Sequence, residues 1–297
     1  MRAPPPLDTG ARVALIAPAG PLRDEAELET AINSVRSLGW EPAVGAHVLE
    51  RDGYLAGSDE RRLADLDRFA RDDTVAAIWC IRGGYGAMRL LDRLDYDAWR
   101  RRPKALIGFS DVTALHCAIG RAADLVTFHG PTARATLSPF SRTSLVEAVC
   151  AGASRALLAP AADILHGGRG RGHVTGGNLA IVAALLGTPF APNFDGAILV
   201  LEDVNEAVYR IDRMLTQLRL SGALDRLRGI AFGHFTDVPA EPDDHARPLA
   251  AVLGEFAGRC GIPCLANIPL GHIHDQWTLP LGAAATLDAD ARTLVME

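Results

Sequence analysis

Short apolar runs alternate with helix-like apolar stripes along the first half of the chain, and each run ends in a turn. Val13–Ala17 is closed by a proline and a glycine, and apolar residues at helical spacing follow between Leu28 and Leu38. The same order recurs after the runs Val75–Ile81 and Ala105–Ile107. Alternating strands and helices are typical of a parallel sheet that is covered by helices on both faces. Its strands are continuous apolar runs because their side chains are buried on both sides. The sequence therefore predicts an α/β fold built on a parallel sheet.

The length of the chain predicts a second domain, because 297 residues are more than one hydrophobic core usually holds. Prolines and a glycine cluster then interrupt the alternation. We place an N-terminal domain at residues 1–135, a crossing segment at 136–170 and a C-terminal domain at 171–297. Later apolar runs predict a mixed α/β arrangement for the C-terminal domain: Ala197–Leu201, Gly229–Phe232, Pro263–Ala266, Ala284–Leu287 and Thr293–Met296.

Composition restricts the partners that the chain is expected to have. The formal net charge of −6 provides no general attraction for nucleic acid or for an anionic membrane. No apolar run approaches the ~18 residues of a membrane span, and the N-terminus lacks the pattern of a secretory signal. The five cysteines are an odd number and predict no disulfide framework. We therefore expect a cytoplasmic protein that acts on small molecules.

The segment Ile107–Asp111 sets a serine in the turn between a predicted strand and the helix that follows it. Such a turn exposes the Ser110 hydroxyl at the carboxyl edge of the sheet, and the helix N-terminus behind it favours an oxyanion there. The alternative is that Ser110 or Asp111 only caps the helix. Val112 stands where the G-x-S-x-G elbow has its second glycine, which argues against an α/β-hydrolase fold.

A glycine-rich turn, Arg82–Gly86, ends the predicted strand Val75–Ile81. Its glycines permit positive φ angles and a close approach of the backbone to a ligand. The turn is neither a P-loop nor a G-x-G-x-x-G fingerprint, and a purely structural role is the alternative. If Ser110 is a nucleophile, adjacent strands bring Gly83 and Gly84 beside it, where backbone amides of the loop would form part of an oxyanion hole.

Two polar segments offer partners for that serine. Glu202 follows the apolar run Ala197–Leu201 and begins an acidic cluster, although acids before a helix also satisfy its dipole. His272 lies near His274 and Asp275, and nothing elsewhere completes a convincing metal-ligand set. These residues fit one mechanism, in which the serine attacks a carbonyl, His272 takes its proton and Glu202 orients the imidazole. No metal or organic cofactor is expected.

Short motifs spread over nearly the whole chain carry a resemblance to a known family. They are Val13–Gly20, Gly53–Gly57, Arg82–Gly86, Ile107–Asp111, His129–Pro131, Gly176–Leu179, Leu201–Asp203, Tyr209–Leu215, and Gly271–His272 followed by Pro280. Each motif is weak alone, but their number and order are highly specific. Together they resemble the LD-carboxypeptidases, a family of serine peptidases that includes muramoyltetrapeptide carboxypeptidase.

The resemblance implies a flavodoxin-like N-terminal domain and a smaller, swivelling α/β C-terminal domain that is barrel-like. It implies a Ser-Glu-His triad at Ser110, Glu202 and His272, and an oxyanion hole from the amides of Asp111 and the glycine loop. Arg82 would then position this loop or meet a substrate carboxylate, although an arginine at a strand end is as often a structural ion-pair partner. Members of the family are frequently homodimers.

The activity that the resemblance implies is release of the terminal D-alanine from a cytoplasmic murein tetrapeptide during cell-wall recycling. The main alternative within the same fold is a microcin C-type self-immunity peptidase that hydrolyses a toxic aminoacyl-nucleotide. A non-catalytic protein that binds a small ligand is a further alternative, against which the three matching triad positions argue. The sequence leaves open the preferred diamino acid and the roles of Asn178, Asp203 and Glu206.

Overall fold

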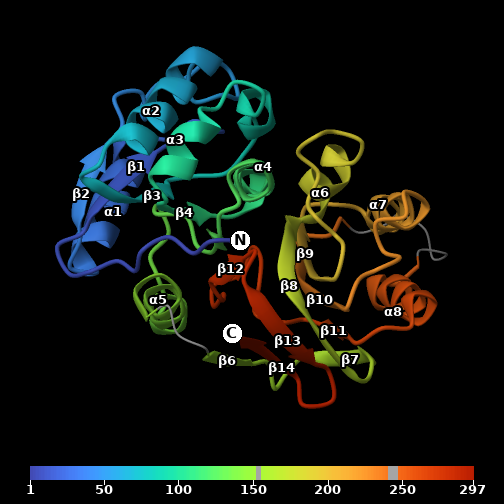
Figure 1. Ribbon diagram of the computed structural model, residues 1–297. Coiled ribbons are helices and arrows are strands. Elements are labelled where there is room, and N and C mark those ends of the chain that lie inside the picture. Colours follow the sequence, from blue (N-terminus) through green and yellow to red (C-terminus); the bar gives the residue numbers. More distant parts are fainter. Residues whose placement is uncertain (152–154, 240–246) are drawn as a thin grey trace. The chain divides into compact units, whose positions relative to one another are not determined.

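The computed structural model describes residues 1–151, 155–239 and 247–297, and the chain divides into two compact units (Figure 1). The first unit comprises Met1–Gly152 and Trp277–Gly282, and the second comprises Ala153–Gln276 and Ala283–Glu297. A short segment near the C-terminus therefore belongs to the first unit. The segment 136–170, where we placed the domain crossing, contains a helix of the first unit and two strands of the second.

A six-stranded sheet forms the centre of the first unit. Its strands are β1 Arg12–Ile16, β2 Glu41–Val44, β3 Val75–Cys80, β4 Ala105–Gly108, β5 Thr127–His129 and β12 Leu279–Leu281. The strand order is β12-β5-β4-β3-β1-β2, and every pair is parallel except β12 with β5. The predicted parallel α/β sheet is confirmed, with one antiparallel strand added at its edge.

Helices alternate with these strands along the chain and surround the sheet (Figure 1). They are α1 Glu25–Ser37, α2 Asp59–Arg71, α3 Tyr96–Arg101, α4 Thr113–Ala123 and α5 Pro139–Val146, with the short helical turns η1 Ala87–Leu90, η2 Ser110–Val112 and η3 Glu147–Ala151. Asp24 and Ser58 start α1 and α2, because their side chains accept backbone N–H groups of the first turn. The carboxyl ends of β1, β3 and β4 lead into loops at one edge of the sheet, which is where ligands bind in folds of this kind.

The second unit is built on an eight-stranded mixed sheet. Its strands are β6 Arg155–Leu158, β7 Asp163–His166, β8 Arg169–Asn178, β9 Ala197–Val204, β10 Gly229–Thr236, β11 Cys264–Ala266, β13 Ala284–Asp288 and β14 Thr293–Met296. In the order β6-β14-β13-β8-β9-β10-β11-β7, strands β8 to β11 are parallel and the outer pairs are antiparallel. The predicted α/β class with two domains is confirmed by these two sheets.

Helices α6 Leu179–Leu185, α7 Val208–Leu220 and α8 Leu249–Cys260 complete the second unit. The apolar stripe of α7 is buried, and Ile211, Leu215 and Leu218 pack in one core with residues of β9 and β10. This core fixes the end of β9, where the acidic segment begins. In the parts of the chain that the structure describes, no helix is long and apolar enough to cross a membrane.

Candidate active site

Ser110 lies just beyond the carboxyl end of β4 with a backbone φ of 64°, a left-handed value that is uncommon for a residue with a side chain. Strain of this kind costs about 1–3 kcal/mol and is typical of a nucleophile on a sharp strand-to-helix turn. Neither η2 nor α4 begins with a capping hydrogen bond from a side chain. These N-caps therefore give no support to the alternative in which Ser110 or Asp111 merely caps the helix.

The glycine-rich loop after β3 lies directly against Ser110. A Cβ atom added to Gly83 would be 2.9 Å from Ser110 Cβ, 3.1 Å from Ser110 Oγ and 3.4 Å from the backbone nitrogen of Asp111. Gly84 has a φ of 112°, and a Cβ atom there would be 3.0 Å from Cα of Gly20 in the loop after β1. Only glycine fits these two positions, so the backbone of the loop reaches contact distance from the serine.

The Asp111 side chain also ties this loop to the serine turn. Its Oδ2 atom accepts a hydrogen bond of 2.8 Å from the Ala87 backbone N–H, and the residue is only 2% exposed. Burial raises the pKa of Asp111 to about 6, against the opposite effects of the Ala87 amide and the Arg62 guanidinium. The residue after the serine thus holds the glycine loop through its side chain, which sequence reasoning did not predict.

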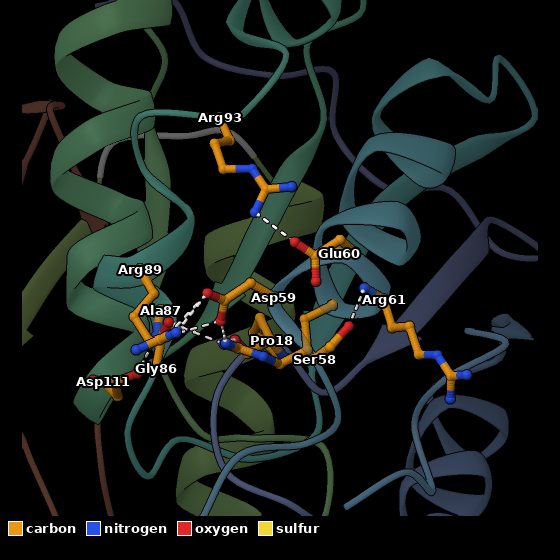
Figure 2. A network of polar contacts seen from close by, with 11 residues as sticks. Pro18, Ser58, Asp59, Glu60, Arg61, Gly86, Ala87, Arg89, Arg93 and Asp111 are labelled. Atoms are coloured by element: carbon orange, nitrogen blue, oxygen red, sulfur yellow. Dashed lines mark hydrogen bonds and ion pairs between the residues drawn. The ribbon is translucent and has the colours of Figure 1, made fainter. Parts of the chain in front are cut away.

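Arg62 on α2 connects further segments around the same turn. It is buried, and its Nη1 atom donates hydrogen bonds to the carbonyl oxygens of Pro18 (2.7 Å) and Gly86 (2.9 Å). Its Nη2 atom pairs with Asp59. Asp59 also accepts hydrogen bonds from Arg89 through both carboxylate oxygens (Figure 2). Burial lowers the pKa of Arg62, but a guanidinium remains charged in proteins. The chain after β1, the glycine loop and α2 are therefore held together by one buried cation.

Replacing Arg62 with methionine is expected to lower the free energy of unfolding by about 2–4 kcal/mol. Two buried carbonyl oxygens lose their donor, and Asp59 loses one of its cationic partners. Urea denaturation measures the loss. The control Arg89→Met removes only the exposed partner of Asp59 and should lower the free energy of unfolding much less, because exposed ion pairs contribute little to stability. Equal losses in the two variants would contradict the role given to Arg62.

Asp111→Asn is expected to change the pH dependence of stability in a defined direction. The native pKa of about 6 is above the ordinary aspartate value of about 3.9, so between these values the native state binds more protons than the unfolded state. The stability that this raised pKa contributes is present below about pH 4 and is lost as the pH rises through about 6. Asparagine does not titrate, so the stability of the wild type relative to the variant should fall by up to about 3 kcal/mol from pH 4 to pH 7.

Urea denaturation of both proteins across this pH range measures the difference. Burial also raises the pKa of Asp203 to about 6, but Asp203 is present in both proteins and its contribution cancels. A stability difference that does not vary with pH would contradict a raised pKa at Asp111.

Glu202 and His272 are in direct contact in the second unit. Glu202 is fully buried near the end of β9, and its Oε2 atom lies 2.8 Å from His272 Nδ1. A carboxylate at Nδ1 favours the tautomer with the proton on that atom, which leaves Nε2 to act as a base. Gly271 permits the contact, because a Cβ atom there would be 2.8 Å from Glu202 Oε2.

Asn178, Asp203 and Glu206, whose roles the sequence leaves open, make local structural contacts. Asn178 caps α6, and its side-chain amide donates to Asp203 Oδ1 at 2.8 Å. Asp203 Oδ2 accepts the Ala180 backbone N–H at 2.8 Å. Glu206 lies 3.7 Å from the Arg210 guanidinium. Asn178 and Asp203 therefore fix the start of α6 beside the strand that carries the buried glutamate.

The second histidine of the C-terminal segment has a different environment from His272. His274 is largely exposed, and its Nε2 atom is 4.0 Å from Asp275 Oδ1. Among the residues that the structure describes, no three His, Cys, Asp or Glu side chains are grouped as ligands for a metal ion. Of the two histidines, His272 is the one in contact with a buried carboxylate.

The predicted site residues fall into two groups, one in each unit. The structure brings Ser110, Asp111, Gly83 and Gly84 together in the first unit, with Arg82 at the start of the same loop. In the second unit it joins the glutamate of β9 to the imidazole that follows Gly271. The first group has the geometry expected around a serine nucleophile, and the second that of an oriented base.

Two family models cover most of the chain. One is described as the LD-carboxypeptidase N-terminal domain and matches residues 13–130, and the other is described as the LD-carboxypeptidase C-terminal domain and matches residues 171–287. The chain belongs to the LD-carboxypeptidase family. The resemblance inferred from the motifs is thereby confirmed.

Relatives in the LD-carboxypeptidase family match the chain over nearly its whole length. A putative carboxypeptidase of Streptomyces coelicolor is 41% identical over 99% of this chain and 96% of its own. The murein tetrapeptide carboxypeptidase of Pseudomonas aeruginosa is 37% identical over 94% of this chain and 94% of its own. The chain is thus a member of a family of peptide hydrolases whose relatives include murein peptide carboxypeptidases.

Solved structures with the LD-carboxypeptidase fold are also similar. The muramoyltetrapeptide carboxypeptidase of Oxalobacter formigenes has a TM-score of 0.85 and 31% identity, covering 96% of this chain and 97% of that one. The structure of MccF in complex with glutamyl sulfamoyl guanosine has a TM-score of 0.91 and 22% identity, covering 99% of this chain and 97% of that one. MccF is described as the microcin C7 self-immunity protein, and at this identity its likeness shows the fold alone.

Sequence reasoning missed Arg62 and Asp59, which brace the loops around Ser110. Arg62 contacts a carbonyl oxygen that lies 44 residues earlier in the chain, and no local pattern predicts such a contact. The first turn of α2 is rich in charged residues and has the composition of an exposed helix face. The usable signal is that Asp59, one turn earlier in the same helix, offers the arginine an i,i+3 partner.

Proposed function

We propose that this protein is a serine LD-carboxypeptidase that releases the terminal D-alanine from a murein tetrapeptide in cell-wall recycling. The observation that carries the proposal is the strained Ser110 in contact with the glycine loop. It is supported by the 37% identity with a relative named murein tetrapeptide carboxypeptidase. On the family resemblance alone, the proposal extends to a cytoplasmic homodimer.

In the proposed mechanism Ser110 Oγ attacks the carbonyl carbon of the bond to D-alanine, and His272 Nε2 takes the hydroxyl proton. The protonated imidazole is stabilised by Glu202 at Nδ1. The backbone amides of Asp111 and of the glycine loop donate hydrogen bonds to the tetrahedral oxyanion. Collapse of this intermediate breaks the C–N bond, and the imidazolium returns its proton to the leaving amine.

The second half of the reaction regenerates the enzyme. A water molecule loses a proton to His272 and attacks the acyl-serine carbonyl, and the second tetrahedral intermediate releases the shortened peptide acid and restores the Ser110 hydroxyl. Ser110 lies in the first unit and the Glu202–His272 pair in the second.

The test incubates the purified protein with a murein tetrapeptide that contains L-centred meso-diaminopimelate and ends in D-alanine. D-alanine release is followed with and without EDTA, and the diastereomer ending in L-alanine is the matched control substrate. We expect EDTA-resistant release from the D-terminated peptide and little from the other. An aminoacyl sulfamoyl nucleoside is assayed in parallel. Cleavage of that compound without D-alanine release would contradict the proposal and favour the self-immunity alternative.

A further inference from the structure

Arginine side chains surround the loop that joins β1 to α1. Arg82 Nη1 donates to the Pro21 carbonyl oxygen at 2.7 Å, and Arg51 Nη2 donates to the Leu22 carbonyl oxygen at 2.8 Å. Arg23 lies on the loop itself, and Arg134, from the chain after β5, pairs with Glu27 in the first turn of α1. All four arginines belong to the first unit.

Glu27 is the carboxylate that faces this group. It lies 2.8 Å from Arg134 and 3.8 Å from Arg23, so its charge is shared by two of the arginines. Among the residues that the structure describes, neither Arg82 nor Arg51 has a carboxylate within ion-pair distance. Both donate instead to backbone carbonyl oxygens, which carry no net charge. Two of the four guanidinium groups therefore have no carboxylate partner among the described residues, and they leave unbalanced positive charge in this group.

The electrostatic effects on Arg82 agree with this geometry. Burial lowers its pKa most, and the neighbouring cations Arg134, Arg23 and Arg51 lower it further, while Glu27 acts in the opposite sense. A guanidinium nevertheless stays charged, so the unbalanced cation remains and is half-buried. A charged group in this position is stabilised when an anion binds to it.

The arginine group adjoins the loop at the serine. The Gly20 backbone N–H donates to the Gly83 carbonyl oxygen at 3.0 Å, and Gly83 is in contact with Ser110. Arg82 precedes Gly83, and its Nε atom would be 3.8 Å from a Cβ atom added to Gly20. Arg82, which has no carboxylate partner among the described residues, is therefore the first residue of the loop that we expect to bind the oxyanion.

We propose that Arg82, supported by Arg51, binds a carboxylate of the peptide substrate next to the scissile bond, an inference that rests on the proposed function. The terminal D-alanine carries one such carboxylate, and the side chain of the diamino acid carries another. Arginine binds carboxylates through two parallel hydrogen bonds, which makes it selective for the acid over the amide. This subsite would restrict the enzyme to peptides with a free carboxylate at that position.

The test measures peptide binding in the Ser110→Ala background by isothermal titration calorimetry. Three peptides are compared: the tetrapeptide acid, its terminal carboxamide, and the peptide in which the side-chain carboxyl of diaminopimelate is amidated. We expect the acid to bind about 10–100-fold more tightly than the terminal carboxamide, the effect expected of a charge-assisted contact. Adding Arg82→Gln should reduce this preference to within about threefold of unity, and Arg51→Gln should reduce it in part.

Arg93→Gln is the control, because Arg93 is exposed and pairs with Glu60 at 3.1 Å on another part of the first unit. It should leave the preference for the acid intact. If Arg82→Gln instead removes a preference for the acid over the peptide with the amidated side chain, that result would also support the subsite. It would identify the side-chain carboxylate of diaminopimelate as the ligand. Preferences unchanged by Arg82→Gln and by Arg51→Gln would overturn it.

Binding and turnover separate this inference from the proposed function. A preference for the acid that depends on Arg82 supports the carboxylate subsite even if the wild type releases no D-alanine, a result that would count against the proposed function alone. Equal affinities for acid and amides in the Ser110→Ala background would overturn the subsite even if the wild type is an active carboxypeptidase. Thermal unfolding of each variant shows whether the exchanged side chain has altered the fold.

Discussion

Replacing Ser110 with alanine is expected to lower kcat for D-alanine release by at least ~10⁴-fold, because covalent catalysis is lost when the nucleophile is removed. Ser110 is half-buried on the rigid β4 turn, and alanine removes only its hydroxyl. Thermal unfolding should therefore change little. D-alanine release, measured with a coupled oxidase assay under saturating substrate, gives the activity.

Ser221→Ala is the matched control for this variant. Ser221 is an exposed serine at the end of α7, and its loss should leave kcat within about twofold of the wild type. A Ser110→Ala protein that is folded and retains more than about a tenth of wild-type kcat would contradict the assignment of Ser110 as nucleophile.

Glu202→Gln is expected to lower kcat by about 10³–10⁴-fold. A carboxylate at Nδ1 favours the imidazole tautomer that leaves Nε2 free to accept the serine proton, whereas an amide can donate to Nδ1 and favour the unproductive tautomer. Glu202 is buried and lies 2.8 Å from His272, so water cannot readily substitute for it.

Glu206→Gln provides the comparison for this second prediction. Glu206 lies four residues after Glu202 in the sequence but pairs with Arg210 at 3.7 Å. Its substitution should change kcat by less than about threefold. Equal losses in the two variants would indicate that general acidity of the segment matters, which would contradict a specific orienting role for Glu202.

Local patterns in the sequence predicted the parallel part of the fold well. The apolar runs Val75–Ile81 and Ala105–Ile107 correspond to β3 and β4, and the run Ala197–Leu201 lies within β9. Burial on both faces leaves an apolar run in such strands whatever the tertiary context, so the sequence carries the signal directly. Element order then follows from the alternation of strands and helices.

Strands that depend on distant partners were not predicted. β8 spans Arg169–Asn178 and contains several glycines, which are unfavourable in strands. It forms because β13 pairs with its residues 169–173 and β9 with its residues 173–178. β12 at Leu279–Leu281 pairs with β5, which lies some 150 residues earlier in the chain. Pairing between such distant segments produces no periodic pattern of apolar residues in the sequence.

The sequence predicted those residues of the candidate site whose side chains themselves carry the proposed chemistry. Ser110, Glu202 and His272 were chosen from strand ends and side-chain chemistry, and the structure gives the serine a strained φ and joins the other two residues. The bracing contacts of Asp111 and Arg62 were not predictable, because they end on backbone groups of Ala87 and Gly86, which any residue possesses. Backbone partners of this kind are identified only from the folded chain.

The most direct test of the central claim is labelling with a fluorophosphonate, which reacts with activated serines. Intact mass follows the rate of labelling and peptide mapping locates the adduct. We predict a single adduct on Ser110 in the wild type, formed at least ~100-fold more slowly in His272→Ala and at the wild-type rate in His274→Ala. An adduct on another residue, or labelling of Ser110 at the same rate without His272, would contradict a Ser110–His272–Glu202 triad.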